Sequence, residues 1–149
     1  MSTPRIQAKA MVVFWRGDLI LVNESHDSVK NETFFRPLGG SIEFGERGEE
    51  TARREIMEEI GAEIGEVRFL RTIENIYTFE GERGHEVVLL FEAEFADPSF
   101  YERDTIECEL HQGEPIKASW KPLAFFRRGE APLYPEGLLD ILLAEHASE

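Results

Sequence analysis

A helix with a narrow apolar stripe and a heavy load of glutamate is the feature that most constrains this sequence. Ala52, Ile56 and Ile60 recur every four residues, while charged side chains fill most other positions from Glu49 onward. Apolar residues at this spacing lie on one face of an α-helix. Gly61 follows directly and suits the left-handed backbone that ends many helices. The spacing therefore predicts an amphipathic helix over residues 49–60, packed by its stripe against a core.

Three glutamates of this helix stand within little more than one turn. They are Glu55, Glu58 and Glu59, and like charges four residues apart repel by roughly 0.2–0.5 kcal/mol per pair. Glu55 and Glu59 have no basic residue three or four positions away and lie at the margin of the stripe, so we expect both to be unpaired. A divalent cation such as Mg²⁺ or Mn²⁺ would supply the missing positive charge through oxygen ligands. The alternative is a solvated acidic face without a ligand.

The loop before the helix extends the pattern over residues 40–62. In order it contains Gly40, five residues, Glu46, seven residues, Arg54-Glu55, an aliphatic residue, any residue, Glu58-Glu59, any residue, Gly61 and Ala62. This spacing resembles the signature of the Nudix hydrolases, except that Ala62 stands where a larger aliphatic residue is usual. The resemblance implies an α/β (α+β) fold, specifically an α/β/α sandwich with a mixed β-sheet, and an enzyme that uses Mg²⁺ or Mn²⁺.

The same resemblance implies roles for four residues. In similar proteins the positions of Glu55 and Glu59 ligate the metal, and the position of Glu58 is a ligand or takes part in activating water. The backbone carbonyl at the position of Gly39 also ligates. Two adjacent glycines allow a backbone path that is closed to other residues, which fits such a role.

Further acidic residues are candidates for positioning and for proton transfer. Glu46 and Arg54 are expected to form an ion pair that ties the loop to the helix. The general base varies among similar proteins, and Glu58 is the first choice by position. Glu114, six residues before Trp120, stands where some relatives have an additional acidic ligand. Glu109 and Glu86 are rivals, and a solvated surface role is the alternative for each.

Contacts to the organic part of a substrate are less constrained by the sequence. Aromatic side chains can stack on a base or simply fill the core, and cationic side chains can contact phosphate or lie on the surface. The candidates are Phe34, Phe35, Tyr77 and Trp120 for stacking, and Arg36 and Lys117 for phosphate or ribose. We expect specificity to lie in residues 25–35 and 96–114.

The rest of the chain indicates a β-rich single domain over residues 1–149. Apolar runs at 8–15 and 19–22 predict a hairpin, and residues 36–40 predict a turn followed by an extended stretch at 41–44. Two long strands are expected at 67–79 and 87–95. Residues 96–114 read as a long polar connection, 115–120 as a strand, 122–126 as a short helical turn and 135–146 as an amphipathic helix with Pro135 near its first turn.

Charge and composition exclude several classes of protein. A net charge of −14 argues against a general nucleic-acid binder, because such a chain repels a bare phosphate backbone. No apolar run approaches the roughly 20 residues that span a bilayer, so we expect no membrane association. The single cysteine, Cys108, forms no intrachain disulfide and favours a cytoplasmic location. The resemblance also allows a homodimer.

These observations lead to one function and three alternatives. The implied reaction is metal-dependent hydrolysis of a pyrophosphate linkage in a nucleoside diphosphate linked to another group: ADP-ribose, a nucleotide sugar, a dinucleoside polyphosphate or a nucleoside triphosphate. A non-catalytic Nudix-like binding or regulatory module is the first alternative, although it has no evident need for the intact set of acidic residues. An isomerase would need a catalytic cysteine, for which Cys108 is weak support. A hydrolase of capped RNA is disfavoured by the acidity.

Overall fold

The protein is described by a computed structural model that covers residues 3–107 and 116–147. The elements run in the order β1 (Gln7–Val13), β2 (Trp15–Arg16), β3 (Leu19–Asp27), β4 (Glu32–Arg36), β5 (Leu38–Ser41), α1 (Gly48–Ile60), β6 (Ile64–Phe79), β7 (Glu82–Phe95), the 3₁₀ helix η1 (Pro98–Glu102), β8 (Thr105–Glu107), β9 (Lys117–Pro122), α2 (Leu123–Arg127) and α3 (Leu138–Ala147). The fold is therefore of the mixed α+β class, as the sequence predicts.

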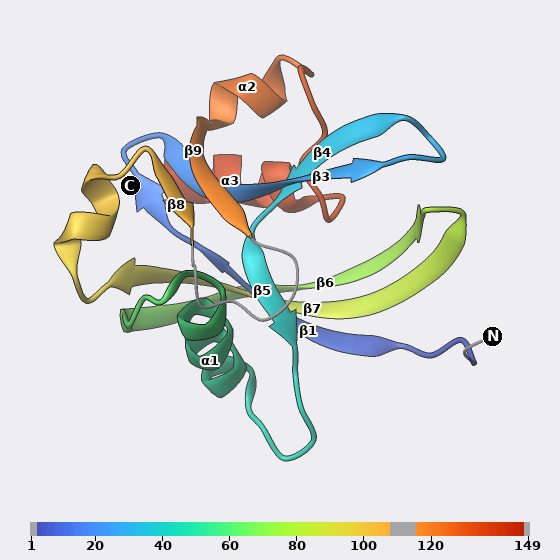
Figure 1. The fold of residues 1–149 in the computed structure, drawn as a ribbon, viewed down its shortest axis with the longest axis horizontal. Helices are drawn as coiled ribbons and strands as arrows, with labels where there is room; N and C mark the ends of the chain where they lie inside the picture. The colour runs from blue at the N-terminus through green and yellow to red at the C-terminus, as the bar shows by residue number, and fades with distance from the viewer. Residues whose placement is uncertain (1–2, 108–115, 148–149) are drawn as a thin grey trace.

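The strands form two sheets that lie between helices (Figure 1). One sheet has the order β5-β1-β7-β6 and is mixed, because β1 pairs in parallel with β7 and antiparallel with β5. The other has the order β2-β3-β9-β8, with β4 paired to β3. The long β6–β7 hairpin reaches out beside the β3–β4 hairpin on the right of Figure 1.

Alternation along β1 shows how the mixed sheet is buried on both faces. Ala10 and Val12 join an apolar cluster that includes the stripe of α1, namely Ala52, Ile56 and Ile60. Met11 and Val13 point the other way, into a second cluster with residues of α2 and α3. Because successive side chains of a strand face opposite sides of the sheet, β1 contributes residues to the apolar clusters on both faces. The result is the expected α/β/α sandwich.

The predicted hairpin of residues 8–15 with 19–22 is wrong in its first strand. Of the predicted first strand, the part that pairs with β3 is the short β2, through Trp15 opposite Ile20 and Arg16 opposite Leu19. β1 lies instead in the other sheet, and the chain passes between sheets at Phe14, which is fully buried. The sequence gives no sign of this change of sheet, because Phe14 and the residues on either side of it form one continuous apolar run.

The predicted turn at residues 36–40 is also wrong. Gly39 and Gly40 belong to β5 and pair with Met11 and Ala10 of β1, and the extended stretch ends at Ser41 instead of continuing to residue 44. A Cβ on Gly39 would overlap the carbonyl oxygen of Ala10, so this glycine allows close approach of two strands. The two glycines therefore place backbone, not a turn, beside α1.

Further boundaries differ from the sequence expectation, and the two long strands begin earlier than predicted, β6 at Ile64 and β7 at Glu82. The connection at 96–114 is not wholly irregular, since it contains η1 and β8, and β8 pairs with β9. The predicted strand at 115–120 is β9, which starts at Lys117, and α3 starts at Leu138 instead of near Pro135.

Cys108, Glu109 and Glu114 lie outside the described residues. In the described part of the chain, no helix combines the length and apolar character needed to cross a bilayer.

Candidate active site

An ion pair fixes the loop before α1 to the helix. Arg54 donates from Nε and Nη2 to the two oxygens of Glu46, at 2.8 and 3.0 Å, which confirms the predicted pairing. Thr51, fully buried in the first half of α1, donates to Glu46 at 2.6 Å. The hydrogen bond from Arg54, and after it that from Thr51, lowers the pKa of Glu46 to about 2. The two ends of the motif are thus held together over the whole neutral range.

Glu55 is not unpaired as expected. The Nη1 atom of Arg54 donates to its Oε1 at 2.9 Å, because the long arginine side chain can fold back over its neighbour although the two residues do not share a helix face. The Glu55 carboxylate also lies directly over Gly40, where any Cβ would overlap it. Gly40 is therefore glycine because a carboxylate occupies the place of its side chain.

Glu59 is the most buried of the three helix glutamates. Its carboxylate is only 4% exposed, and the backbone N–H of Gly39 donates to it at 3.2 Å. Burial, followed by the nearby charge of Glu55, raises the pKa of Glu59 to about 8. A buried carboxylate beside a second carboxylate is stabilised by either a proton or a cation.

A cavity of about 170 Å³ opens beside these two carboxylates. Glu55 and Glu59 line it together with the backbone of Gly39 and Gly40 and with three further charged residues, Lys9, Arg36 and Glu86. Hard oxygen donors of this kind suit Mg²⁺ or Mn²⁺, and the glycine backbone leaves them room, so the residues fit the implied metal.

The site is not a ready-made metal cage. Within residues 3–107 and 116–147, no three carboxylate, imidazole or thiol groups converge closely enough to hold an ion. Part of the reason is Arg54, which draws both Glu55 and Glu58 toward itself. Glu58 is 53% exposed, contacts Arg54 at 3.2 Å and lines neither of the cavities described here. Its part in the site stays a prediction.

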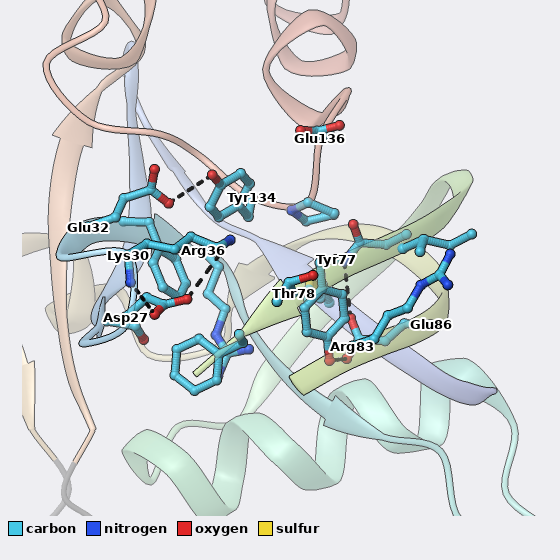
Figure 2. Close-up of a pocket in the computed structure, with 17 residues that line it drawn as sticks. Asp27, Lys30, Glu32, Arg36, Tyr77, Thr78, Arg83, Glu86, Tyr134 and Glu136 are labelled. Carbon is cyan, nitrogen blue, oxygen red and sulfur yellow. Dashed lines mark hydrogen bonds and ion pairs between the residues drawn. The ribbon is translucent and has the colours of Figure 1, made fainter. Parts of the chain in front are cut away.

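A larger cavity of about 620 Å³ adjoins the first (Figure 2). Its volume is in the range of small-molecule sites. Among the residues that the structure describes, Met11, Arg36 and Glu86 line both cavities. Its remaining lining comes mainly from the β3–β4 and β6–β7 hairpins and from the segment before α3.

The structure sorts the aromatic and cationic candidates. Phe34 and Tyr77 line the larger cavity, whereas Phe35 and Trp120 are buried in the two apolar clusters. Tyr134, which sequence reasoning missed, also lines the larger cavity and donates to Glu32 at 2.9 Å. Its neighbourhood comes from distant segments and leaves no local signal in the sequence. Arg36 lines both cavities, and Lys117 lines neither.

The tips of the two hairpins are tied together beside the larger cavity. Asp27, which is buried and lines the cavity, accepts the backbone N–H groups of Val29 and Lys30 at 3.0 Å each and that of Glu80 at 3.2 Å. These contacts lower the pKa of Asp27, the bond from Lys30 having the largest effect. Ser28 in turn donates its backbone N–H to Glu80 at 2.6 Å. Two loops from different sheets are thereby joined.

The protein is an α/β/α sandwich whose motif helix places a buried carboxylate, Glu59, and a partly buried one, Glu55, against the glycines of β5 and beside a cavity. A model of the NUDIX domain matches residues 5–130. The chain belongs to this family, as the motif predicts, and with it to the Nudix class of hydrolases.

Solved structures agree on the fold. The E. coli ORF135 protein matches with a TM-score of 0.65 at 18% identity, covering 98% of this chain and 94% of its own. A NUDIX hydrolase from Nitrosomonas europaea matches with a TM-score of 0.64 at 16% identity, covering 97% and 90%. An ADP compounds hydrolase matches with a TM-score of 0.58 at 20% identity, covering 87% and 64%.

Proposed function

We propose that the protein hydrolyses a pyrophosphate linkage in a nucleoside diphosphate joined to another group, using Mg²⁺ or Mn²⁺. The observation that carries this proposal is the buried carboxylate of Glu59 beside Glu55, facing a cavity that adjoins a larger one. Such a pair calls for a cation, and the larger cavity offers room for the organic part of a substrate. One of the similar solved structures is that of an ADP compounds hydrolase, which is consistent with this class of substrate.

Cationic groups at the site explain how a chain of net charge −14 accepts a polyanion. Lys9 and Arg36 line the smaller cavity together with the two helix carboxylates. Arginine and lysine bind phosphate oxygens by charge-assisted hydrogen bonds. Together with a bound cation, they neutralise a diphosphate that the rest of the protein would repel.

The chain contributes mainly by holding its groups in place. Glu55, Glu59 and the Gly39 carbonyl would hold the cation, and Arg54 with Glu46 fixes the helix relative to the loop. When bound, the cation neutralises the diphosphate and makes a water molecule more acidic. Glu58, and Glu114 outside the described residues, remain our candidates for the base. A loss of less than about threefold in rate on Glu114→Gln would remove Glu114 from that role.

The first experiment is an assay of orthophosphate release with added phosphatase, in Mg²⁺, Mn²⁺ or EDTA. The panel contains ADP-ribose, nucleotide sugars, dinucleoside polyphosphates and nucleoside triphosphates. We expect turnover on one class, abolished by EDTA. If protein that still binds Mn²⁺ releases no orthophosphate from any member of the panel, the result would favour the non-catalytic binding module.

A double variant tests the metal-binding pair. Changing both Glu55 and Glu59 to Gln should remove Mn²⁺ binding and turnover, because neutral amides replace the two anionic ligands. The matched control is Glu63→Gln, an exposed position just beyond the helix, which should leave both unchanged. Full turnover of the double variant would refute the proposed site.

A further inference from the structure

Glu86 is a buried carboxylate next to apolar residues on one face of β7. It is 5% exposed, and along β7 it shares its face with Val88 and Leu90, which are fully buried. Burying an ionisable group costs free energy unless hydrogen bonds compensate. A glutamate kept at such a position calls for a role in the cavities that it lines.

The neighbouring strand holds this carboxylate in a fixed orientation. Asn75 lies directly opposite Glu86 in the β6–β7 register and donates to its Oε1 at 3.3 Å. Tyr77, two residues on, donates its hydroxyl to Oε2 at 3.3 Å, as Figure 2 shows. A Cβ at Gly84 would overlap the Tyr77 ring, so the glycine lets that ring lie across β7. The hairpin is thus built to present both oxygens of Glu86.

Glu86 lies where the two cavities meet. The smaller cavity contains Glu55 and Glu59 and, on the proposed function, takes the diphosphate. The larger contains the rings of Phe34, Tyr77 and Tyr134, which suit a base. In a nucleotide the ribose joins phosphate to base, so the junction is the place of the ribose.

Only one of the three junction residues can accept a hydrogen bond from a sugar hydroxyl through a carboxylate. Arg36 is a donor only, and the thioether of Met11 is a weak acceptor. Glu86 has about four acceptor positions on its two oxygens. Asn75 uses one on Oε1 and Tyr77 one on Oε2, while Lys9 Nζ forms an ion pair with Oε2 at 3.9 Å, beyond hydrogen-bond distance. Each oxygen therefore keeps acceptor capacity for one of two adjacent hydroxyls.

Resting on the proposed function, we propose that Glu86 binds the vicinal hydroxyls of a ribose and selects ribonucleotides over 2′-deoxyribonucleotides. A 2′-deoxy sugar leaves one desolvated carboxylate oxygen without its donor, which is the situation in which polar sites discriminate strongly. The substrate class is accordingly a ribonucleoside diphosphate derivative and not a deoxynucleoside triphosphate.

The test measures binding without turnover. Nucleoside 5′-monophosphates have no pyrophosphate linkage, so the four ribonucleotides and their 2′-deoxy forms can be titrated calorimetrically with Mg²⁺ present. We expect at least one ribonucleotide to bind about 10- to 100-fold more tightly than its deoxy form, the range for a hydrogen bond to a charged group. Because turnover is not measured, a protein that discriminates but hydrolyses nothing contradicts the proposed function while leaving this inference intact.

Three variants test whether the preference for ribonucleotides depends on Glu86. Glu86→Gln should reduce the ratio of ribo to deoxy affinity about tenfold, and Tyr77→Phe should reduce it less, since the carboxylate keeps its bond from Asn75. Glu74→Gln is the matched control, exposed on β6, the strand that pairs with β7, and should leave the ratio unchanged. Circular dichroism confirms that each variant is folded.

Titrations of ribose 5-phosphate and 2-deoxyribose 5-phosphate distinguish two diols that Glu86 can bind: the ribose of the nucleoside and a sugar on the other side of the pyrophosphate linkage. Discrimination among the nucleotides that depends on Glu86 assigns the nucleoside ribose. Discrimination confined to the sugar phosphates, and lost in Glu86→Gln, overturns the selection of ribonucleotides, because Glu86 would then bind a sugar other than that of the nucleoside. Equal affinity in both pairs overturns the inference, as does a Glu86→Gln variant that keeps the wild-type ratio of affinities.

Discussion

Replacing Glu59 by Gln should make the metal-free protein more stable while removing its metal affinity. The buried Glu59 carboxylate accepts from Gly39 and faces Glu55, and its protonated form can donate to Glu55. A glutamine reproduces that protonated form, since its oxygen accepts from Gly39 and its NH₂ group donates to Glu55. The variant therefore keeps the favourable contacts and loses the buried charge.

The size of the effect follows from the pKa of Glu59. Burial and the charge of Glu55 raise this pKa from 4.5 to about 8. The folded state thus binds the proton more tightly than the unfolded chain, so the contribution of Glu59 to stability is greatest below about pH 4.5 and is lost as the pH rises to about 8. Each pH unit above 4.5 costs about 1.4 kcal/mol, which amounts to roughly 3 kcal/mol at pH 7. Glu59→Gln has no such dependence.

Urea denaturation in EDTA at pH 5 and pH 7 measures this difference. We expect the variant to exceed the wild type by about 1–3 kcal/mol at pH 7 and by less than about 1 kcal/mol at pH 5. The exposed Glu63→Gln control should change stability by less than about 0.5 kcal/mol at either pH. A destabilised Glu59→Gln variant at pH 7, or equal gains at both pH values, would refute the reasoning about the buried charge.

Three other substitutions test separate parts of the structure. Gly40→Ala places a methyl group on the Glu55 carboxylate, and we expect Mn²⁺ affinity measured by electron paramagnetic resonance to fall at least about tenfold. Ile56→Ala removes a fully buried side chain of α1 and should lower the free energy of unfolding in urea by about 2–5 kcal/mol, whereas an unchanged midpoint would show that the stripe does not pack as described. Asp27→Ala should separate the hairpin tips, so that the amide of Glu80 exchanges hydrogen faster by mass spectrometry while amides of α1 do not.

The motif was readable because its residues are local. Glu46, Arg54, Glu55 and Glu59 lie within one loop and one helix, where spacing fixes which side chains share a face. The helix, its glycine cap with φ of 68° and the Glu46–Arg54 pair all follow from that spacing. The error over Glu55 has a local cause too, because helical spacing describes directions and not the reach of a long arginine.

The change of sheet at Phe14 and the extended path of Gly39 and Gly40 were misjudged for a different reason. An apolar run reads the same whether it pairs with its neighbour in sequence or with a distant strand. Likewise, glycines serve both turns and close strand contacts. The contact that decides between them at Gly39 comes from β1, about 30 residues earlier.

By itself, the sequence determined the family and the acidic helix, and it predicted the residues that would hold a cation. The cavities required the tertiary structure, since their walls combine β1, two hairpins from different sheets and the segment before α3. The place of Glu86 shows the difference. From the sequence it is one of several rival candidates for the general base, among thirty acidic residues. In the fold, Asn75 and Tyr77 hold it between a charged and an aromatic cavity, because strand pairing brings together groups that no local spacing relates.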